Sequence, residues 1–139
     1  MTNNVEATVR EYYRIVGDLQ CTEEQLRPLI APDAVFTEHP NPIAPHGAVR
    51  TVEQNLNGFR AGRALLSDQT VEVLEVLVSG DRAAVRATWS GTVGVDRGPF
   101  TAGTELSCVM AAFMTVIDDK IVAHDTYDCY PPLPVPVPA

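Results

Sequence analysis

The sequence has 139 residues, of which 45% are hydrophobic and 20% are charged, and its formal net charge at pH 7 is −8. This length predicts one domain with a hydrophobic core of its own. The acidic charge, and the absence of a basic stripe with interleaved aromatic residues, argue against nucleic acid and anionic membranes as partners. The first residues lack the basic and apolar regions of a signal peptide, and no apolar run approaches the roughly 20 residues of a membrane span.

The cysteines and histidines are isolated from one another. Cys21, Cys108 and Cys129 are odd in number and form no CxxC pair, which is typical of reduced thiols in a cytoplasmic protein. No two histidines have the short spacing of metal ligands. We therefore expect a cytoplasmic protein without a bound metal.

The N-terminal half is predicted to be mainly helical. Apolar residues recur at helical spacing in the first segment, and Asn3 or Asn4 can cap it. Capping boxes begin two further helices at Thr22 and Thr51. Between these helices, residues 34–39 read as a short strand, and residues 40–47 are rich in the Pro and Gly of a loop.

From Thr70 onward the apolar period changes from that of a helix to that of a strand. The predicted strands are 70–78, 83–91, 104–117 and 121–130. Short turns join most of them, so an antiparallel sheet is expected. Residues 1–130 therefore predict a single α+β domain, a cone in which three N-terminal helices pack on a strongly curved sheet around a pocket. The proline-rich residues 131–139 predict an extended tail outside the domain.

Several motifs along this pattern resemble a known family. They are "APDAVFTEHPNP", the hairpin "SGDRAAVRATWSG" and the closing pair "FMTVIDDKIVAHDTYD". Together they resemble the SnoaL-like branch of the NTF2-like superfamily, whose relatives include ketosteroid isomerase, limonene epoxide hydrolase and polyketide cyclases. The resemblance spans roughly residues 5–130. It implies a curved sheet around an apolar cavity, a homodimer, and neither metal nor organic cofactor.

The resemblance also implies a kind of chemistry. Family members with known reactions use a pocket Asp or His as acid–base and a Tyr or second acid as hydrogen-bond donor. We therefore expect a cofactor-free acid–base enzyme, an isomerase or cyclase acting on a hydrophobic small molecule of polyketide, steroid or terpenoid type. The alternative is a non-catalytic module for ligand binding or dimerisation. Epoxide hydrolysis is less favoured, because no arginine set between two acids is evident.

The segment "HDTYDCY" at residues 124–130 holds the principal candidates. The two-residue period places His124 and Asp128 on one face of a strand, and Asp125 and Tyr127 on the other. A β-bulge would exchange the faces, and the sequence leaves that alternative open. The resemblance assigns the family's acidic residue to Asp128, which we expect to face the cavity as the main acid–base residue. Val122 would continue that face as apolar lining.

Further candidates come from other elements. If Phe36 faces the core, Glu38 shares its face at the cavity mouth, while His39 points away unless the chain kinks before Pro40. The alternative is that Glu38 and His39 are ordinary polar residues beside a turn and have no catalytic role. Either Tyr12 or Tyr13 can supply an oxyanion donor, and Tyr13 is the one we name. The predicted catalytic set is Asp128, His124, His39, Glu38 and Tyr13; the predicted substrate-binding set is Phe36, Phe59, Trp89, Met110 and Phe113.

A homodimer is expected on independent grounds. Residues 104–117 are apolar on both predicted faces of the strand, with Leu106, Cys108, Met110, Ala112 and Met114 on one and Val109, Ala111, Phe113 and Val116 on the other. One helical layer covers a single face, so the second face predicts a partner.

Overall fold

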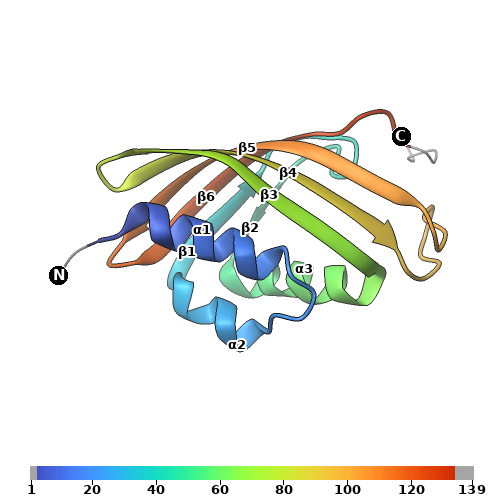
Figure 1. Cartoon of the computed structure of the whole chain (residues 1–139), viewed down its shortest axis with the longest axis horizontal. Coiled ribbons are helices and arrows are strands. Elements are labelled where there is room, and N and C mark those ends of the chain that lie inside the picture. The colour runs from blue at the N-terminus through green and yellow to red at the C-terminus, as the bar shows by residue number, and fades with distance from the viewer. Residues whose placement is uncertain (1–2, 134–139) are drawn as a thin grey trace.

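The computed structural model of the chain describes residues 3–133, and it has the predicted α+β architecture (Figure 1). The helical elements are α1 (Val5–Val16), α2 (Glu23–Leu26) with the 3₁₀ turn η1 (Arg27–Leu29), and α3 (Val52–Leu65). The strands are β1 (Ile30–Glu38), β2 (Ala48–Arg50), β3 (Leu66–Ser79), β4 (Arg82–Val93), β5 (Glu105–Ile117) and β6 (Lys120–Cys129). The helices lie against one face of a twisted sheet (Figure 1).

The helices begin where the capping residues predict. The Asn4 side chain accepts a hydrogen bond from the backbone N–H of Ala7 at the start of α1. Thr51 and Gln54 form the capping box of α3. Pro28 cannot donate a backbone hydrogen bond, and the short α2 gives way to a 3₁₀ turn at this proline.

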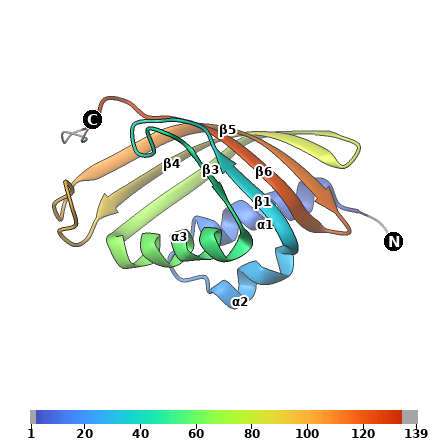
Figure 2. The same cartoon turned by 180° about the vertical axis from the view of Figure 1, so that it is seen from behind.

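The sheet has six strands in the order β2-β1-β6-β5-β4-β3. Consecutive strands β3 to β6 pair antiparallel, as expected for short connections. β1, however, pairs parallel with β6, so the sheet is mixed (Figure 2). The strand β2, which sequence analysis did not anticipate, pairs antiparallel with β1 at the edge.

The two faces of the sheet differ in burial. The inner face, which meets the helices, carries fully buried Met114, Val116 and Ile121. Val116 therefore lies on the buried face of β5 and not on the outer face where sequence analysis placed it. The β5–β6 register shifts between Thr115 and Val116. This bulge puts Ile121, rather than the expected Val122, into the core.

The β5–β6 turn is tied to the start of the chain. Asp118 and Asp119 both have positive φ, at 53° and 60°, the conformation of a tight hairpin turn that Asp tolerates. Asn4 donates its backbone N–H to the Asp119 carboxylate at 2.6 Å, and Asn3 donates its side-chain amide to the carbonyl of Val116 at 2.7 Å. These hydrogen bonds thus fix the start of α1 to the end of the sheet where β5 turns into β6.

Three observations concern the remaining sequence predictions. Within residues 3–133, no helix is long and apolar enough to cross a membrane. Residues 131–133 of the predicted proline-rich tail are outside any strand, and residues 134–139 lie outside the described part of the chain. All three cysteines are free thiols.

Candidate active site

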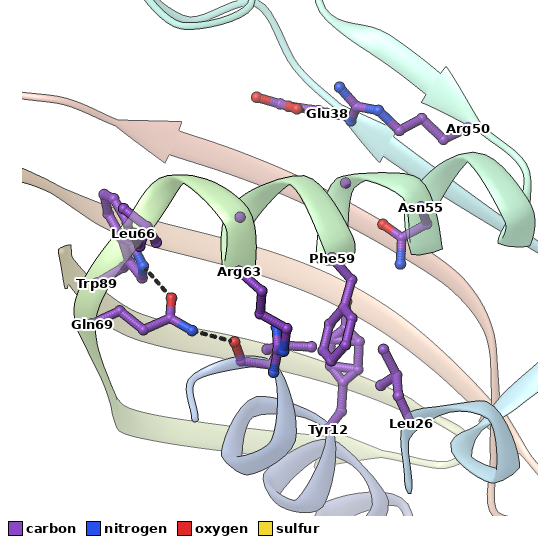
Figure 3. Close-up of a pocket in the computed structure, with 13 residues that line it drawn as sticks. Tyr12, Leu26, Glu38, Arg50, Asn55, Phe59, Arg63, Leu66, Gln69 and Trp89 are labelled. Carbon is purple, nitrogen blue, oxygen red and sulfur yellow. Dashed lines mark hydrogen bonds and ion pairs between the residues drawn. The ribbon is translucent and has the colours of Figure 1, made fainter. Parts of the chain in front are cut away.

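A cavity of about 400 Å³ opens between the helices and the inner face of the sheet. Helix α3 and the end of α1 cover it, and Glu38 and Arg50 stand at one side (Figure 3). Of the predicted residues, Glu38, Phe59 and Trp89 line it. Aromatic and aliphatic side chains from α1, α3 and the sheet thus surround a small set of polar groups, the composition typical of a small-molecule site.

The charged wall of the cavity is the pair Glu38–Arg50. Arg50 donates from Nη1 to Glu38 Oε1 at 2.8 Å, and Asn41 donates from Nδ2 to Glu38 Oε2 at 2.8 Å. Asn41 is buried, and its Oδ1 accepts the backbone N–H groups of Ile43 and Ala44. The proline-rich loop is therefore folded around one asparagine, which also holds the Glu38 carboxylate in place.

A second polar group lies deeper, where α1 crosses β6. The imidazole of His124 is enclosed by the rings of Tyr12, Tyr13 and Phe36, whose centroids lie 5.6, 6.4 and 5.8 Å away. The Tyr13 hydroxyl lies 3.4 Å from His124 Nε2. Burial lowers the pKa of His124 to about 4, despite the opposing charge of Asp125, because desolvation penalises the imidazolium form. His124 is therefore neutral at physiological pH.

The structure distinguishes the two tyrosines. Tyr12 lines the cavity, whereas Tyr13, the tyrosine named from the sequence, does not. Burial raises the pKa of Tyr12 to about 12, with a hydrogen bond to Asn55 acting in the opposite direction. Tyr12 thus remains protonated at physiological pH and, unlike Tyr13, belongs to the cavity lining.

Asp128 lies on the inner face of β6, opposite Met110 of β5. Thr126 donates its hydroxyl to Asp128 Oδ1 at 2.6 Å. Burial raises the pKa of Asp128, the Thr126 bond lowers it, and the charge of Glu38 raises it again. The net direction is upward. Asp128 is not among the residues that line the 400 Å³ cavity, but the charge of Glu38, which does line it, acts on the Asp128 carboxyl.

The cavity is closed at one end by a hydrogen-bonded chain. Trp89 donates its indole N–H to Gln69 Oε1 at 2.9 Å, and Gln69 donates from Nε2 to the carbonyl of Val16 at 2.8 Å (Figure 3). The ring of Trp89 fits because Gly91, two residues along β4, has no side chain: a Cβ there would lie 2.8 Å from the indole. These two hydrogen bonds join β4, β3 and the end of α1.

Two predicted site residues lie on the opposite face of the sheet. His39 points outward, where its Nε2 bonds to Asp125 Oδ1 and its ring stacks on Tyr127 with centroids 4.0 Å apart. Phe113 is 45% exposed and meets Tyr127 edge-on. The strand period explains both placements, since neither residue shares the parity of the inward positions on its strand. We therefore remove His39 and Phe113 from the candidate site.

The two other predicted lining residues are part of the core. Phe36 is 3% exposed and packs beside His124. Met110 is a partly buried residue packed against the same core. Neither residue lines the cavity.

Sequence reasoning also missed several cavity residues. Arg50 ends the three-residue strand β2, which is too short to give a periodic signal, and its contact with Glu38 depends on the β1–β2 register. Asn55 and Arg63 lie on α3, and Gln69 lies at the start of β3. For Asn55 and Arg63, the helical spacing of four residues from apolar Phe59 was the one available signal. Among the residues described, no group of His, Cys, Asp or Glu could hold a metal ion.

The fold is a cone-shaped α+β domain with a cavity between its helices and its sheet. The family profile described as the SnoaL-like domain matches residues 9–124, and the chain belongs to this family. No curated protein is similar enough in sequence to be matched.

Solved structures show the same fold. IdmH of Streptomyces antibioticus, to which polyketide cyclase activity is attributed, is 28% identical, with a TM-score of 0.74 over 90% of this chain and 91% of that one. AclR of Streptomyces galilaeus, to which hydroxylase activity is attributed, is 21% identical (TM-score 0.72; 91% and 79% covered). A Catenulispora acidiphila protein of ketosteroid isomerase-like fold, in complex with trimethylamine, is 19% identical (TM-score 0.68; 89% and 86% covered).

Proposed function

We propose that the protein is a cofactor-free acid–base enzyme that isomerises or cyclises a hydrophobic small molecule. Family membership and the likeness to IdmH support a small-molecule cyclase or isomerase as the class. The cavity supports the same class, because its aromatic and aliphatic walls suit a flat, largely apolar substrate. A shared fold by itself does not determine the reaction.

The observation that carries the proposal is the partly buried Asp128. Burial raises the pKa of its carboxyl, and a carboxylate of raised pKa is a better general base near neutral pH. In this proposal the substrate extends from the cavity past Glu38, whose charge acts on Asp128, and so reaches the Asp128 carboxylate. Asp128 removes a proton from a carbon next to a carbonyl group, and the two electrons of the C–H bond move to form an enolate. The protonated Asp128 then returns the proton to another carbon, which completes an isomerisation. Alternatively, the enolate carbon attacks a second carbonyl to close a ring, the C=O electron pair moves to oxygen, and the proton of Asp128 passes to the resulting alkoxide.

The negative oxygen of the enolate needs a neutral donor. Tyr12 is protonated because burial raises its pKa to about 12, and it lines the cavity. Its O–H donates to the carbonyl oxygen as negative charge develops there. Neutral His124 lies against the ring of Tyr12 and beside the hydroxyl of Tyr13, where it acts as a positioning residue for α1.

The test is turnover of a β,γ-unsaturated ketone and of a linear poly-β-ketone by Asp128→Asn. Asparagine keeps the size of the side chain and removes its proton-accepting charge, so turnover should fall by about 10²–10⁴-fold. Asp125→Asn is the matched control, because Asp125 lies three residues away on the outer face, and its turnover should stay near that of the wild type. Equal turnover in wild type and Asp128→Asn would refute the role of Asp128.

One observation favours a second candidate, a non-catalytic binding module. Asp128 does not line the cavity, and Glu38 is already paired with Arg50. NMR titration of the carboxyl groups separates the candidates. An Asp128 pKa at its ordinary value of about 3.9, together with no turnover of either ketone, would favour binding without catalysis.

We also propose that the protein forms a homodimer through the outer face of the sheet. Five large apolar residues on this face are 43–59% exposed, and we call them the outer patch: Leu77, Val109, Phe113, Ile117 and Tyr127. An exposed apolar group on one sheet face is typical of a protein–protein contact. In a two-fold dimer the outer patch of one subunit would meet the outer patch of the other, so that apolar side chains contact apolar side chains.

A further inference from the structure

Two arginines line the cavity, and the structure uses them differently. Arg63 donates from Nε to the carbonyl of Cys21 and from Nη2 to those of Ile15 and Asp18, at 3.1, 3.1 and 2.7 Å. Its guanidinium also lies over the ring of Phe59, 3.3 Å from the centroid. Arg63 therefore satisfies the carbonyl groups that follow α1, and its donors are largely occupied.

Arg50 is not occupied in this way. Its Nη1 donates to Glu38, and Glu38 is the only partner of its guanidinium among residues 3–133. A guanidinium presents five N–H donors in a fixed planar arrangement. The Arg50 side chain is 35% exposed and that of Glu38 is 16% exposed, so the remaining donors lie at the open side of the cavity.

The position of Arg50 is fixed by its neighbours. Its backbone pairs with Phe36 in the β1–β2 register, and Thr51 caps α3 immediately after it. Asn41 holds the other oxygen of Glu38. A cation held in this way meets a ligand with little loss of side-chain freedom on binding, and an arginine favours flat, bidentate oxygen anions.

We propose that Arg50 is the specificity-determining residue of this cavity and that it recognises an anionic oxygen group on a flat hydrophobic ligand. The chemical class is an aromatic or polycyclic carboxylate, or an acidic enol or phenol bound as its anion. The ring system packs against the apolar walls formed by Leu26, Phe59 and Trp89. This inference rests on the proposed function only in placing the substrate in the same cavity.

Because the net charge of the chain is negative, binding of an anion in this cavity depends on Arg50. The formal net charge of −8 repels anions at long range. Anion recognition therefore depends on a local cation, and the cavity holds one arginine with open donors. The formal charges of Glu38 and Arg50 cancel, so a bound anion shares the guanidinium with Glu38, in a three-membered arrangement in which Arg50 bridges two carboxylates.

The experiment compares two ligands of nearly the same size and shape, the anion 2-naphthoate and the neutral 2-naphthamide. Binding is followed by quenching of Trp89, which is the single tryptophan of the sequence and lines the cavity. The wild type should bind naphthoate about tenfold or more tighter than naphthamide, the range expected of a hydrogen bond between charged groups. No preference, or no binding of naphthoate at millimolar concentration, would overturn the proposal.

Three variants isolate the role of Arg50. Glu38→Gln/Arg50→Gln removes both charges and leaves the net charge unchanged; it should lose the preference and keep the affinity for naphthamide. Glu38→Gln alone should keep or increase the preference, because it frees the guanidinium. Arg86→Gln is the control: Arg86 is exposed on the outer face beside Glu75, and its preference should equal that of the wild type. If the double variant still prefers naphthoate to naphthamide, a residue other than Arg50 recognises the anion.

The same assay separates this inference from the proposed catalysis. Turnover by Asp128→Asn tests the catalytic role, whereas the naphthoate preference of the wild type and of Glu38→Gln/Arg50→Gln tests the anion site. If turnover is unaffected in Asp128→Asn while the Arg50 variants lose the preference, the catalytic role fails and the anion site stands. If turnover falls in Asp128→Asn and the wild type shows no preference for naphthoate, the anion site fails and the catalytic role stands.

Discussion

The enclosed His124 makes the stability of the fold depend on pH in a specific direction. Its pKa is lowered to about 4, whereas an unfolded chain titrates histidine near 6.5. The rings of Tyr12, Tyr13 and Phe36 surround it, and Asp125 is the charged group that acts in the opposite direction. Between the two pKa values, the unfolded chain binds a proton that the folded protein does not.

The magnitude follows from these two values. They differ by about 2.5 (6.5 − 4), which corresponds to about 3 kcal/mol at 1.36 kcal/mol for each pKa unit. Because the folded pKa is depressed, this stability is fully present above pH 6.5 and is lost as the pH falls toward 4. Domains of this size unfold with about 5–15 kcal/mol, so the loss is a large part of the total.

The assay is denaturant unfolding of wild type and His124→Gln at about pH 7.5 and about pH 4.5. Glutamine does not titrate and keeps an amide near the Tyr13 hydroxyl. The stability difference between the proteins should narrow by about 2–3 kcal/mol on acidification, because only the wild type loses the histidine contribution. A difference that is constant with pH, or an imidazole that titrates near 6.5 in the folded protein by NMR, would refute the reasoning.

The remaining predictions concern the tryptophan wall and the outer face. Gly91→Ala should displace the Trp89 indole, since the new Cβ would lie 2.8 Å from it; we expect red-shifted tryptophan emission and weaker naphthamide binding, and an unchanged emission spectrum would contradict the packing. Wild-type protein should sediment at micromolar concentration as a species of twice its 15.1 kDa chain mass, and Phe113→Asp in the outer patch should return it to the monomer. A wild-type monomer would contradict the dimer.

Local signals in the sequence predicted most of the fold. Thr51 and Gln54 identify the start of α3, and the adjacent Asp118 and Asp119 identify a hairpin turn. The parallel pairing of β1 with β6 had no such signal, because it joins segments about ninety residues apart. A β-bulge in the last strand was left open as an alternative, but its position near Val122 could not be predicted, since its cause is the β5–β6 register and not the composition of either strand.

The sequence predicted on which face of the sheet a candidate residue lies wherever the alternation of a strand decides it. Glu38 and Asp128 lie on the inner face, as their positions relative to Phe36 and His124 require. The same parity separates Met110 from Phe113, which therefore could not both face one cavity. Arg50 could not be predicted, because its role arises from the reach of a long side chain to another strand, and no local pattern encodes that distance.

The tie between the first helix and the β5–β6 turn bears on the order in which the protein folds. Asn4 and Asp119 are 115 residues apart in sequence, and β1 obtains its long partner only from β6. During synthesis, α1 and β1 therefore leave the ribosome well before the strands that hold them. Contacts of such long sequence separation slow folding, and they leave the apolar stripe of α1 exposed for most of translation. The nascent N-terminal segment is consequently the part of the chain that a chaperone would meet first.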